Sequence, residues 1–504
     1  MSSTKTRSAS SGPTPGRETA LARSPDFKYW EFGALAVGIF ASVLDHGSVN
    51  VSLPTISSHF RTDLPTIQWV VIIYSLTIAA LLLPMGRLSD LVGRKKIYIF
   101  GIMVLGTGAA LSGLSPSLEL LFPSRVLQGI GAAMTQGTGM AIVTAVFPAN
   151  EKGRAIGMFM TMVGVGAIAG PAIGGLLVDF FGWRVVFFLT LPLNIIGAVA
   201  TLWVLRGWTE EKEADRARFD WLGATLSTGV LVALLLAMTI GNKAGWFSPS
   251  IVIAFTAAIG MLGTFIWWEL RTSAPMLDLR LFRRKTFSLG ISAAFLTFLG
   301  SSAVLFMMPF YLQNVLGYSA KAAGFAVVPG AICMAIMGTV SGVLSDRFGW
   351  RSFTVGGLAS SGIGLLILSC ITEDSSLWMV VPALMLMNIG MGTFYSPNSS
   401  SVMSSVVVSK YGVVSGFLNL VRNAANVTSI AFATVIVTTT MASMGFEPSL
   451  EAVRGEAEGV DQAFTLGLRY AFLAMMSIIV VSLTFSALQP NRIPEPEPQD
   501  TANR

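Results

Sequence analysis

Two short stretches decide the fold class, and the first is GRLSDLVGRKK, residues 86–96. The second is GVLSDRFGWR, residues 342–351. Each lies between two apolar runs, and in both a glycine, the triplet Leu-Ser-Asp and a second glycine recur at the same spacing. An internal repeat of this kind predicts two related halves, which is an arrangement typical of membrane transporters.

The composition around these stretches indicates that lipid is the main solvent of the chain. Of its 504 residues, 53% are hydrophobic and 12% are charged, with a mean hydropathy of +0.68. Soluble proteins carry about 25% charged residues. Two histidines and two cysteines are too few for a zinc cluster or a disulfide framework, so no metal site is expected.

Fourteen apolar runs have about the length that a helix needs to cross a bilayer. We therefore expect an all-α polytopic membrane protein with fourteen transmembrane helices. The runs lie near residues 30–53, 67–85, 97–114, 120–146, 155–179, 183–205, 221–240, 250–269, 287–311, 322–344, 352–371, 376–395, 411–441 and 463–487.

The domain organisation follows from the repeat and the charged segments. We expect two six-helix bundles, with a linker between them that contains two extra transmembrane helices. The expected segments are a disordered cytoplasmic tail (1–29), the first bundle (30–205), the linker (206–286), the second bundle (287–488) and a second cytoplasmic tail (489–504).

The distribution of Lys and Arg predicts the topology. With a cytoplasmic N-terminus, 25 of the 33 basic residues fall in cytoplasmic segments and five in outer loops. Positive charge favours the cytoplasmic side, so both termini are expected there. The expected location is a bacterial inner membrane. The net charge of +6 is thereby explained by topology, and no nucleic-acid partner is expected.

One carboxylate lies near the middle of a predicted span. Asp45 is followed by His46, Gly47, Ser48, Val49 and Asn50. Burial disfavours the charged form of a carboxylate, so Asp45 could exchange a proton or pair with a cationic ligand. Alternatively, it joins Asn50 and neighbouring helices as a structural hydrogen-bonding hub.

A basic residue lies inside the fourth apolar run, LFPSRVLQGIGAA, residues 121–133. An intramembrane Arg such as Arg125 is costly and usually faces the bundle interior or a water-filled cavity with a partner. The alternative is an Arg that extends to the interface. Gln128, like His46 and Asn50, is a candidate for lining a cavity. Gly129 allows close helix packing.

Three further groups are candidates for gating or for lining a cavity. The fifth run, GAIAGPAIGGLL (166–177), combines spaced glycines with a proline that bends a helix. The two repeated loops are either gate elements or charged anchors that fix topology. A polar stripe on the thirteenth run shares one helical face. The residues are Gly166, Gly170, Pro171, Gly174 and Gly175; Gly86, Asp90, Gly93, Arg94, Gly342, Asp346 and Arg347; and Asn419, Arg422, Asn423 and Asn426.

At these motifs the sequence resembles the major facilitator superfamily, and within it the fourteen-helix drug/proton antiporters of the EmrB/QacA type. The resemblance extends from about Trp30 to Leu488. It departs from the family pattern at Gly47, where members usually carry Thr.

The resemblance implies two bundles that rock around a central cavity. It implies that Asp45 responds to protons, that Arg125 assists, that Asp90 and Arg94 latch the cytoplasmic side, and that residues 166–177 seal the contact between the bundles. The implied activity is multidrug efflux by proton antiport, with antibiotic resistance as its consequence. No cofactor is implied; the proton gradient is the energy source.

Other functions remain open at this point. The same fold could export a lipid, a siderophore or a metabolite, or take up a substrate with protons. A membrane enzyme or a receptor-like sensor is disfavoured, because the sequence has neither a phosphate-binding loop nor a nucleophile motif. The expected partners are the bilayer, protons and a small amphipathic substrate; accessory efflux proteins are not identified.

Overall fold

A computed structural model describes residues 27–147, 152–204, 220–245, 248–272, 278–406, 411–446 and 459–490. All regular structure in these residues is helical. The helices are α1 (Phe27–Phe60), α2 (Leu64–Ile67), α3 (Trp69–Val92), α4 (Arg94–Leu114), α5 (Leu118–Val146), α6 (Lys152–Phe181), α7 (Val185–Phe188), α8 (Thr190–Val204), α9 (Trp221–Ala244), α10 (Pro249–Glu269), the short η4 (Leu279–Arg283), α11 (Lys285–Phe310), the π-turn η5 (Tyr311–Val315), α12 (Ala320–Phe348), α13 (Trp350–Leu368), α14 (Leu377–Ser404), α15 (Tyr411–Ser443) and α17 (Val460–Ala487).

The helix lengths confirm the all-α membrane fold. Thirteen described helical segments are long and apolar enough to cross a membrane. The remaining long helix, α5, has 29 residues and occupies the fourth expected run. Its apolar character is diluted by Arg125, Gln128, Gln136 and several glycines and threonines. The side chains of Arg125, Gln128 and Gln136 form hydrogen bonds in the interior of the protein.

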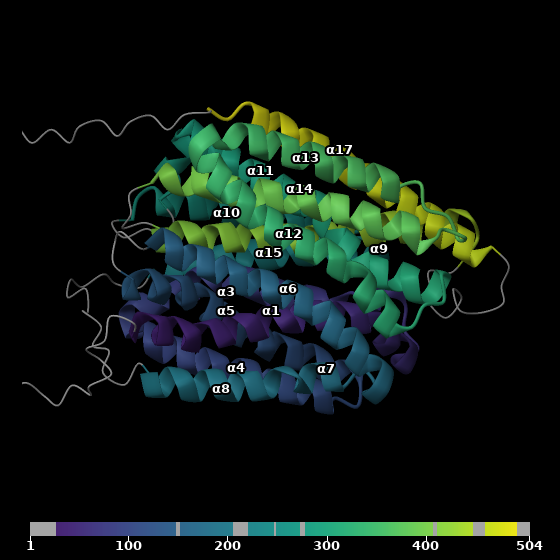
Figure 1. The fold of residues 1–504 in the computed structure, drawn as a ribbon, viewed down its shortest axis with the longest axis horizontal. Coiled ribbons are helices and arrows are strands. Elements are labelled where there is room, and N and C mark those ends of the chain that lie inside the picture. Colours follow the sequence, from purple (N-terminus) through teal and green to yellow (C-terminus); the bar gives the residue numbers. More distant parts are fainter. Residues whose placement is uncertain are drawn as a thin grey trace, which may run out of the picture.

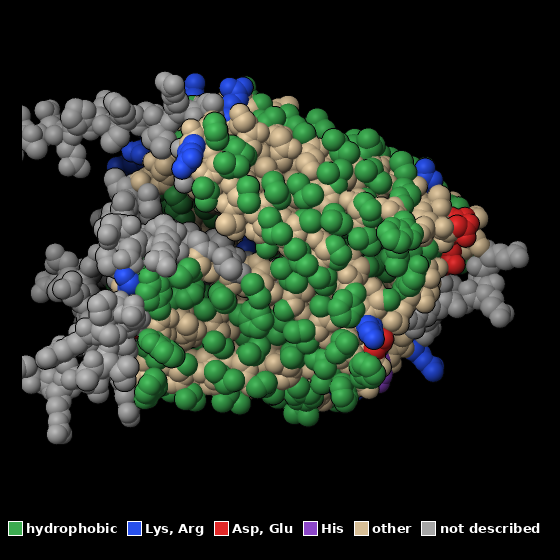
Figure 2. All heavy atoms as spheres, viewed as in Figure 1, with side chains coloured by type: hydrophobic (Ala, Val, Ile, Leu, Met, Phe, Trp, Pro, Cys, Tyr) green, Lys and Arg blue, Asp and Glu red, His purple; other side chains and the backbone are tan. Residues whose placement is uncertain are grey.

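The surface agrees with a lipid environment. Figure 2 shows hydrophobic side chains over the flank of the molecule, while charged side chains gather at its two ends. Helix α10 illustrates this, because Ile253 and Ile259 are 66% and 70% exposed. Apolar side chains at such exposure are costly in water and favourable in a hydrocarbon layer.

The long helices run roughly parallel and form two groups (Figure 1). Helices α1 to α8 pack mainly on one another, as do α11 to α17, and the main contacts between the groups are α6 with α12 and α3 with α15. Helix α1 begins and α17 ends at the same end of the bundle, which we call the near end; the opposite end is the far end. Figure 2 shows the surface hollowed at the near end.

The two repeated loops have the same local structure. Gly93 and Gly349 both adopt a positive φ, 115° and 83°, and each separates two long helices. A glycine meets this requirement at little cost because it has no Cβ. The backbone N–H of each glycine donates to the carbonyl of Ser89 or Ser345, at 3.0 and 2.9 Å. The internal repeat in the sequence is therefore a repeat in structure.

The sixth expected span is confirmed as Val185–Val204, with a local irregularity at Leu189. The structure divides residues 185–204 into α7 and α8, which meet at Leu189. Pro192 explains the break, because it has no N–H to donate to the carbonyl of Phe188 four residues earlier. The expected beginning of the first span, residue 30, is also late, since α1 begins at Phe27. Its first three residues belong to the segment that we expected to be a tail.

Helix α6 packs closely against two neighbours because of its glycines. A Cβ at Gly166 would lie 3.0 Å from the Cβ of Val43 in α1, and a Cβ at Gly170 would lie 2.9 Å from the carbonyl of Leu44. Gly47 of α1 belongs to this contact, since a Cβ there would lie 2.8 Å from Pro171. A larger residue at position 47 would push α1 and α6 apart.

The opposite face of α6 contacts α12 equally closely. A Cβ at Gly175 would overlap the carbonyl of Ala320, and a Cβ at Gly324 would overlap the carbonyl of Pro171. A second connection joins the groups toward the far end, where the Gln313 side chain donates from Nε2 to the carbonyl of Val51 at 2.9 Å. Backbone groups of the two halves are thus in direct contact toward this end.

The hairpin of α9 and α10 lies beside the seam between the two groups. Helix α9 contacts both α3 and α15. Thr228 donates from its hydroxyl to the carbonyl of Ala80 at 2.9 Å, and Trp268 of α10 donates from Nε1 to Asp220 at 2.8 Å. The Asp220 carboxylate also caps the first turn of α9 through the N–H of Gly223.

We expect Gly175→Leu to separate α6 from α12 and to weaken the contact between the two groups of helices, because the side chain has no space beside Ala320. Gly263→Leu in α10 is the matched control, since a Cβ there meets nothing within 4 Å. Disulfide trapping between cysteines introduced at Val51 and Gln313 would report the separation. Equal trapping in both variants would contradict this account of the contact.

Candidate functional site

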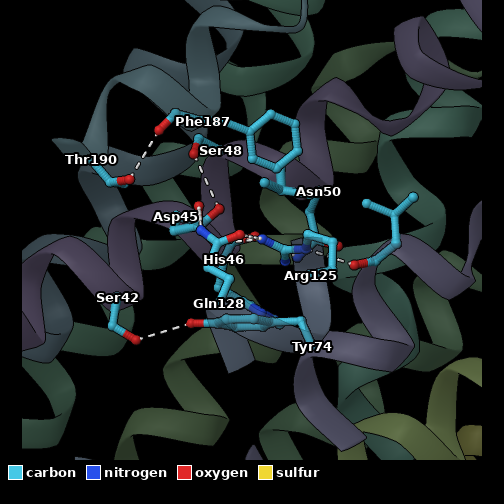
Figure 3. A network of polar contacts seen from close by, with 12 residues as sticks. Ser42, Asp45, His46, Ser48, Asn50, Tyr74, Arg125, Gln128, Phe187 and Thr190 are labelled. Atoms are coloured by element: carbon cyan, nitrogen blue, oxygen red, sulfur yellow. Dashed lines mark hydrogen bonds and ion pairs between the residues drawn. The ribbon is translucent and has the colours of Figure 1, made fainter. Parts of the chain in front are cut away.

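The centre of the site is a triangle of three polar side chains from α1 and α5 (Figure 3). Arg125 donates from Nη1 to Oδ2 of Asp45 at 2.9 Å and to Oε1 of Gln128 at 2.6 Å. Gln128 in turn donates from Nε2 to Oδ1 of Asp45 at 2.8 Å. Both carboxylate oxygens of Asp45 are therefore occupied by protein donors.

These charges are withdrawn from solvent. The Arg125 side chain is 0% exposed and that of Asp45 is 1% exposed. An ion pair in such surroundings is stable only when its geometry is good and its other polar atoms have partners. Removing one member leaves an uncompensated buried charge, which costs about 3–5 kcal/mol.

Helix α3 completes the environment of the guanidinium. Arg125 donates from Nε to the carbonyl of Val70 at 2.9 Å. The guanidinium carbon lies 4.3 Å from the ring centroid of Tyr74 and 5.7 Å from that of Phe187. A desolvated cation over an aromatic ring is stabilised by about 2 kcal/mol. The ring of Tyr74 thus supports the charge that Asp45 neutralises.

A glycine in α5 makes this arrangement possible. A Cβ at Gly129 would lie 2.7 Å from the Cβ of Thr77 and 3.0 Å from the carbonyl of Tyr74. With glycine at this position, α5 lies directly against α3, and Arg125, one turn earlier, reaches Val70 and Tyr74. The predicted packing role of Gly129 thereby gains a structural basis.

A second layer of polar groups lies beside the triangle. The hydroxyl groups of Tyr74 and Ser42 are 3.1 Å apart, and Gln136 donates from Nε2 to Ser42 at 3.1 Å. The sequence analysis missed Ser42, Tyr74 and Gln136. A usable signal was present, because Ser42 precedes Asp45 by three residues and Gln136 follows Gln128 by eight, so each shares a helical face with a predicted site residue.

His46 and Asn50 lie next to the triangle without bonding to it. His46 is half-buried, and its ring centroid is 6.3 Å from that of Tyr74. Asn50 donates from its amide nitrogen to the carbonyl of His46 at 2.9 Å. The sequence left open a structural hub that joins Asp45 and Asn50. These two described side chains form no hydrogen bond with each other.

The polar stripe of α15 faces the first group of helices. Asn426 donates from its amide to the hydroxyl of Ser75 in α3 at 3.3 Å. Arg422, one turn earlier, is half-buried and lies close enough to His46 and Tyr74 to act on both electrostatically. Asn423 is 8% exposed and donates to the backbone carbonyl of Asn419.

The loop residues lie away from this site. Gly86 and Gly342 belong to the last two turns of α3 and α12, and Ser89 and Ser345 bond to their carbonyls. Arg94 is half-buried at the start of α4, and Arg347 is exposed. The side chains of Asp90 and Asp346 are outside the described residues, so the expected latch between Asp90 and Arg94 stays a prediction.

A helical membrane protein with two related groups of helices and a buried charge pair between its spans has the architecture of a membrane transporter. Residues 35–222 and 217–430 match the Major Facilitator Superfamily. The chain belongs to this family, and to its fourteen-helix branch of the EmrB type. Membership of a transporter family also answers the question of enzyme activity, since these proteins are not enzymes.

Relatives and solved structures agree with this assignment. The chain is 36% identical to the multidrug resistance protein Stp of Mycobacterium tuberculosis (strain ATCC 25618 / H37Rv), over 83% of this chain and 77% of that protein. It is 32% identical to the riboflavin transporter RibZ of Clostridioides difficile (strain 630), over 79% and 86%. An inward-facing bacterial homologue of the lysosomal transporter Spinster has the same fold, with a TM-score of 0.62 at 20% identity over 92% and 97% of the two chains.

We expect Asp45→Asn to lower the free energy of unfolding by about 3–5 kcal/mol, because Arg125 then remains buried without a counter-charge. The double variant Asp45→Asn, Arg125→Gln is expected to recover a large part of this loss, since both charges are gone. Thermal unfolding of the purified protein in detergent measures both variants. Additive losses in the double variant would show that the two side chains do not interact.

Proposed function

We propose that this protein exports small amphipathic or hydrophobic compounds by proton antiport and alternating access. The observation that carries the proposal is the buried triangle of Asp45, Arg125 and Gln128. A membrane-buried carboxylate is a functional candidate by default. Among the described residues it is the one carboxylate located well away from the ends of its helix.

The triangle gives proton binding a structural consequence. Protonation of Asp45 would remove the negative charge that faces Arg125, and the guanidinium would then be buried with only neutral partners. Such a state is unfavourable by several kcal/mol, so Arg125 and its helix are driven toward another arrangement. Proton binding and helix movement are coupled in this way without any additional ligand.

The contact between the two groups supplies the second element of the proposal. Contact toward the far end, through Gly175 with Ala320 and Gln313 with Val51, together with the hollow at the near end, fits a carrier open to the near side. We assign the near end, with both termini, to the cytoplasm. Residues 166–177 act as the seal and the two repeated loops as gates.

The names of the relatives support transport of a small compound without fixing which one. Stp is named as a multidrug resistance protein and RibZ as a riboflavin transporter. The second candidate function is therefore transport of a metabolite on the same machinery, a class that extends to lipids and siderophores, including symport with protons. The relatives are bacterial, which fits an inner-membrane location.

The proton gradient is a sufficient energy source for this task. A membrane potential of 100 mV contributes about 2.3 kcal/mol per elementary charge, which corresponds to roughly 40-fold accumulation. No nucleotide or cofactor enters the proposed cycle.

The test is transport in proteoliposomes with an imposed pH gradient, using riboflavin, rhodamine 6G and fluorescein as neutral, cationic and anionic probes. We expect the wild type to concentrate at least one probe in a manner that a protonophore abolishes. Asp45→Asn is expected to lose concentrative transport while retaining exchange down a gradient.

Asp179→Asn is the matched control, because Asp179 is an exposed carboxylate on α6. It should transport like the wild type. Normal coupling in Asp45→Asn would assign the proton site elsewhere. Movement in the direction of the proton flux would replace antiport by symport.

A further inference from the structure

A second intramembrane cation faces the site from the other half of the molecule. Arg422 lies in α15, eleven residues after its start, on the face that carries Asn419 and Asn426. The bond from Asn426 to Ser75 directs this face toward α3, and Arg422 acts electrostatically on His46 and Tyr74. The helical face that carries Arg422 is therefore turned toward α3 and the interior of the bundle.

Arg422 has no counter-charge in the described part of the chain. It forms no hydrogen bond or ion pair there, although it is half-buried. Asp45 cannot serve, because Arg125 and Gln128 occupy both of its oxygens and its side chain is 1% exposed. The other described carboxylates of the spans lie near helix ends.

The charge balance of the site is therefore positive. Asp45 and Arg125 neutralise one another, and Arg422 adds a positive charge that no described residue neutralises. An intramembrane Arg without a protein partner is unfavourable, unless it faces water or a ligand that compensates its charge. A lipophilic cation in this place would be repelled by Arg422 and would find no accessible carboxylate among the described residues.

The neighbours of Arg422 fit an anionic group attached to an apolar body. The guanidinium presents a planar set of donors that matches carboxylate, phenolate or phosphate oxygens. The half-buried amide of Asn419 is a further donor one turn away. Of the two rings on which Arg422 acts, that of His46 is half-buried and can contact an apolar body, while that of Tyr74 is buried behind it, with the two centroids 6.3 Å apart.

We propose that Arg422 binds a negatively charged group of the transported substrate, so that the substrates of this carrier are amphipathic organic anions. The proposal rests on the proposed transport function and gives it a substrate class. The proton site at Asp45 and the anion site at Arg422 are then separate. Loss of one negative charge from the cell and entry of one proton both move positive charge inward, so an inside-negative potential drives both.

Binding and transport are measured separately to test this proposal. Fluorescein anisotropy with the purified protein in detergent reports binding without a gradient, and riboflavin and rhodamine 6G are the neutral and cationic probes for transport in phosphatidylcholine proteoliposomes. The variants are Arg422→Gln and Arg422→Lys. Arg469→Gln is the matched control, since Arg469 is exposed and donates to the carbonyl of Ser369, directly after α13.

The expected result is that wild type binds and concentrates fluorescein and excludes rhodamine 6G. Loss of a charge-assisted hydrogen bond weakens binding roughly ten- to a hundredfold, so Arg422→Gln should raise the Kd and KM for fluorescein by that factor. Arg422→Lys should recover part of the affinity, and Arg469→Gln should bind and transport fluorescein like the wild type. Any transport of the neutral probe riboflavin should be the same in Arg422→Gln as in the wild type.

Proton-driven transport of rhodamine 6G in preference to fluorescein would overturn the anion site and leave the proposed antiport intact. Binding of fluorescein that depends on Arg422, without any gradient-driven transport, would support the anion site and overturn the proposed antiport. Competition by phosphatidylglycerol that disappears in Arg422→Gln would assign the site to a lipid headgroup and overturn a soluble substrate. Equal loss of all probes in Arg422→Gln would make Arg422 structural.

Discussion

The burial of Arg125 is the constraint on which the site depends. A guanidinium with no exposed surface requires a counter-charge, a carbonyl acceptor and a supporting ring. Helix α1 supplies the counter-charge, and α3 supplies the carbonyl and the ring. Three helices are therefore fixed relative to one another by one side chain. An unpaired buried charge costs several kcal/mol. The helices therefore either keep the ion pair or rearrange to give Arg125 a new environment, and intermediate states are unfavourable.

Close packing at glycines is the second feature that holds the helices together. Between helices in lipid, the hydrophobic effect gives little driving force, so association depends on close packing and hydrogen bonds. Gly129 brings α5 onto α3, Gly170 brings α6 onto α1, and Gly175 brings α6 onto α12. Helix α6 thus contacts both halves through opposite faces. A movement of one half relative to the other must either preserve these backbone contacts or break them together, which favours two discrete states over a continuous range.

The sequence was sufficient for the number of helices, for the repeated loops and for singling out Asp45 and Arg125 as intramembrane charges. Apolar length and charge placement determine the first, and the cost of intramembrane charge determines the last. It was insufficient for Tyr74, for the Val70 carbonyl and for the break at Leu189. A tyrosine or a carbonyl in an apolar run is unremarkable until a neighbouring helix brings a cation against it. Such contacts depend on helix packing, which periodicity does not report.

The same geometry separates the proposed roles of the two halves. Both oxygens of Asp45 are held by α5, so a substrate cannot reach the carboxylate unless the triangle opens. Tyr74 is one group on which both cations act: its ring lies against Arg125, its hydroxyl is paired with Ser42, and Arg422 acts on it electrostatically from α15. A proton on Asp45 changes what Arg125 requires from that ring. Because Tyr74 is 2% exposed, a ligand at Arg422 would influence the ring by changing the charge near it and not by direct contact. Coupling of proton and substrate through a shared aromatic side chain needs no direct competition for one carboxylate.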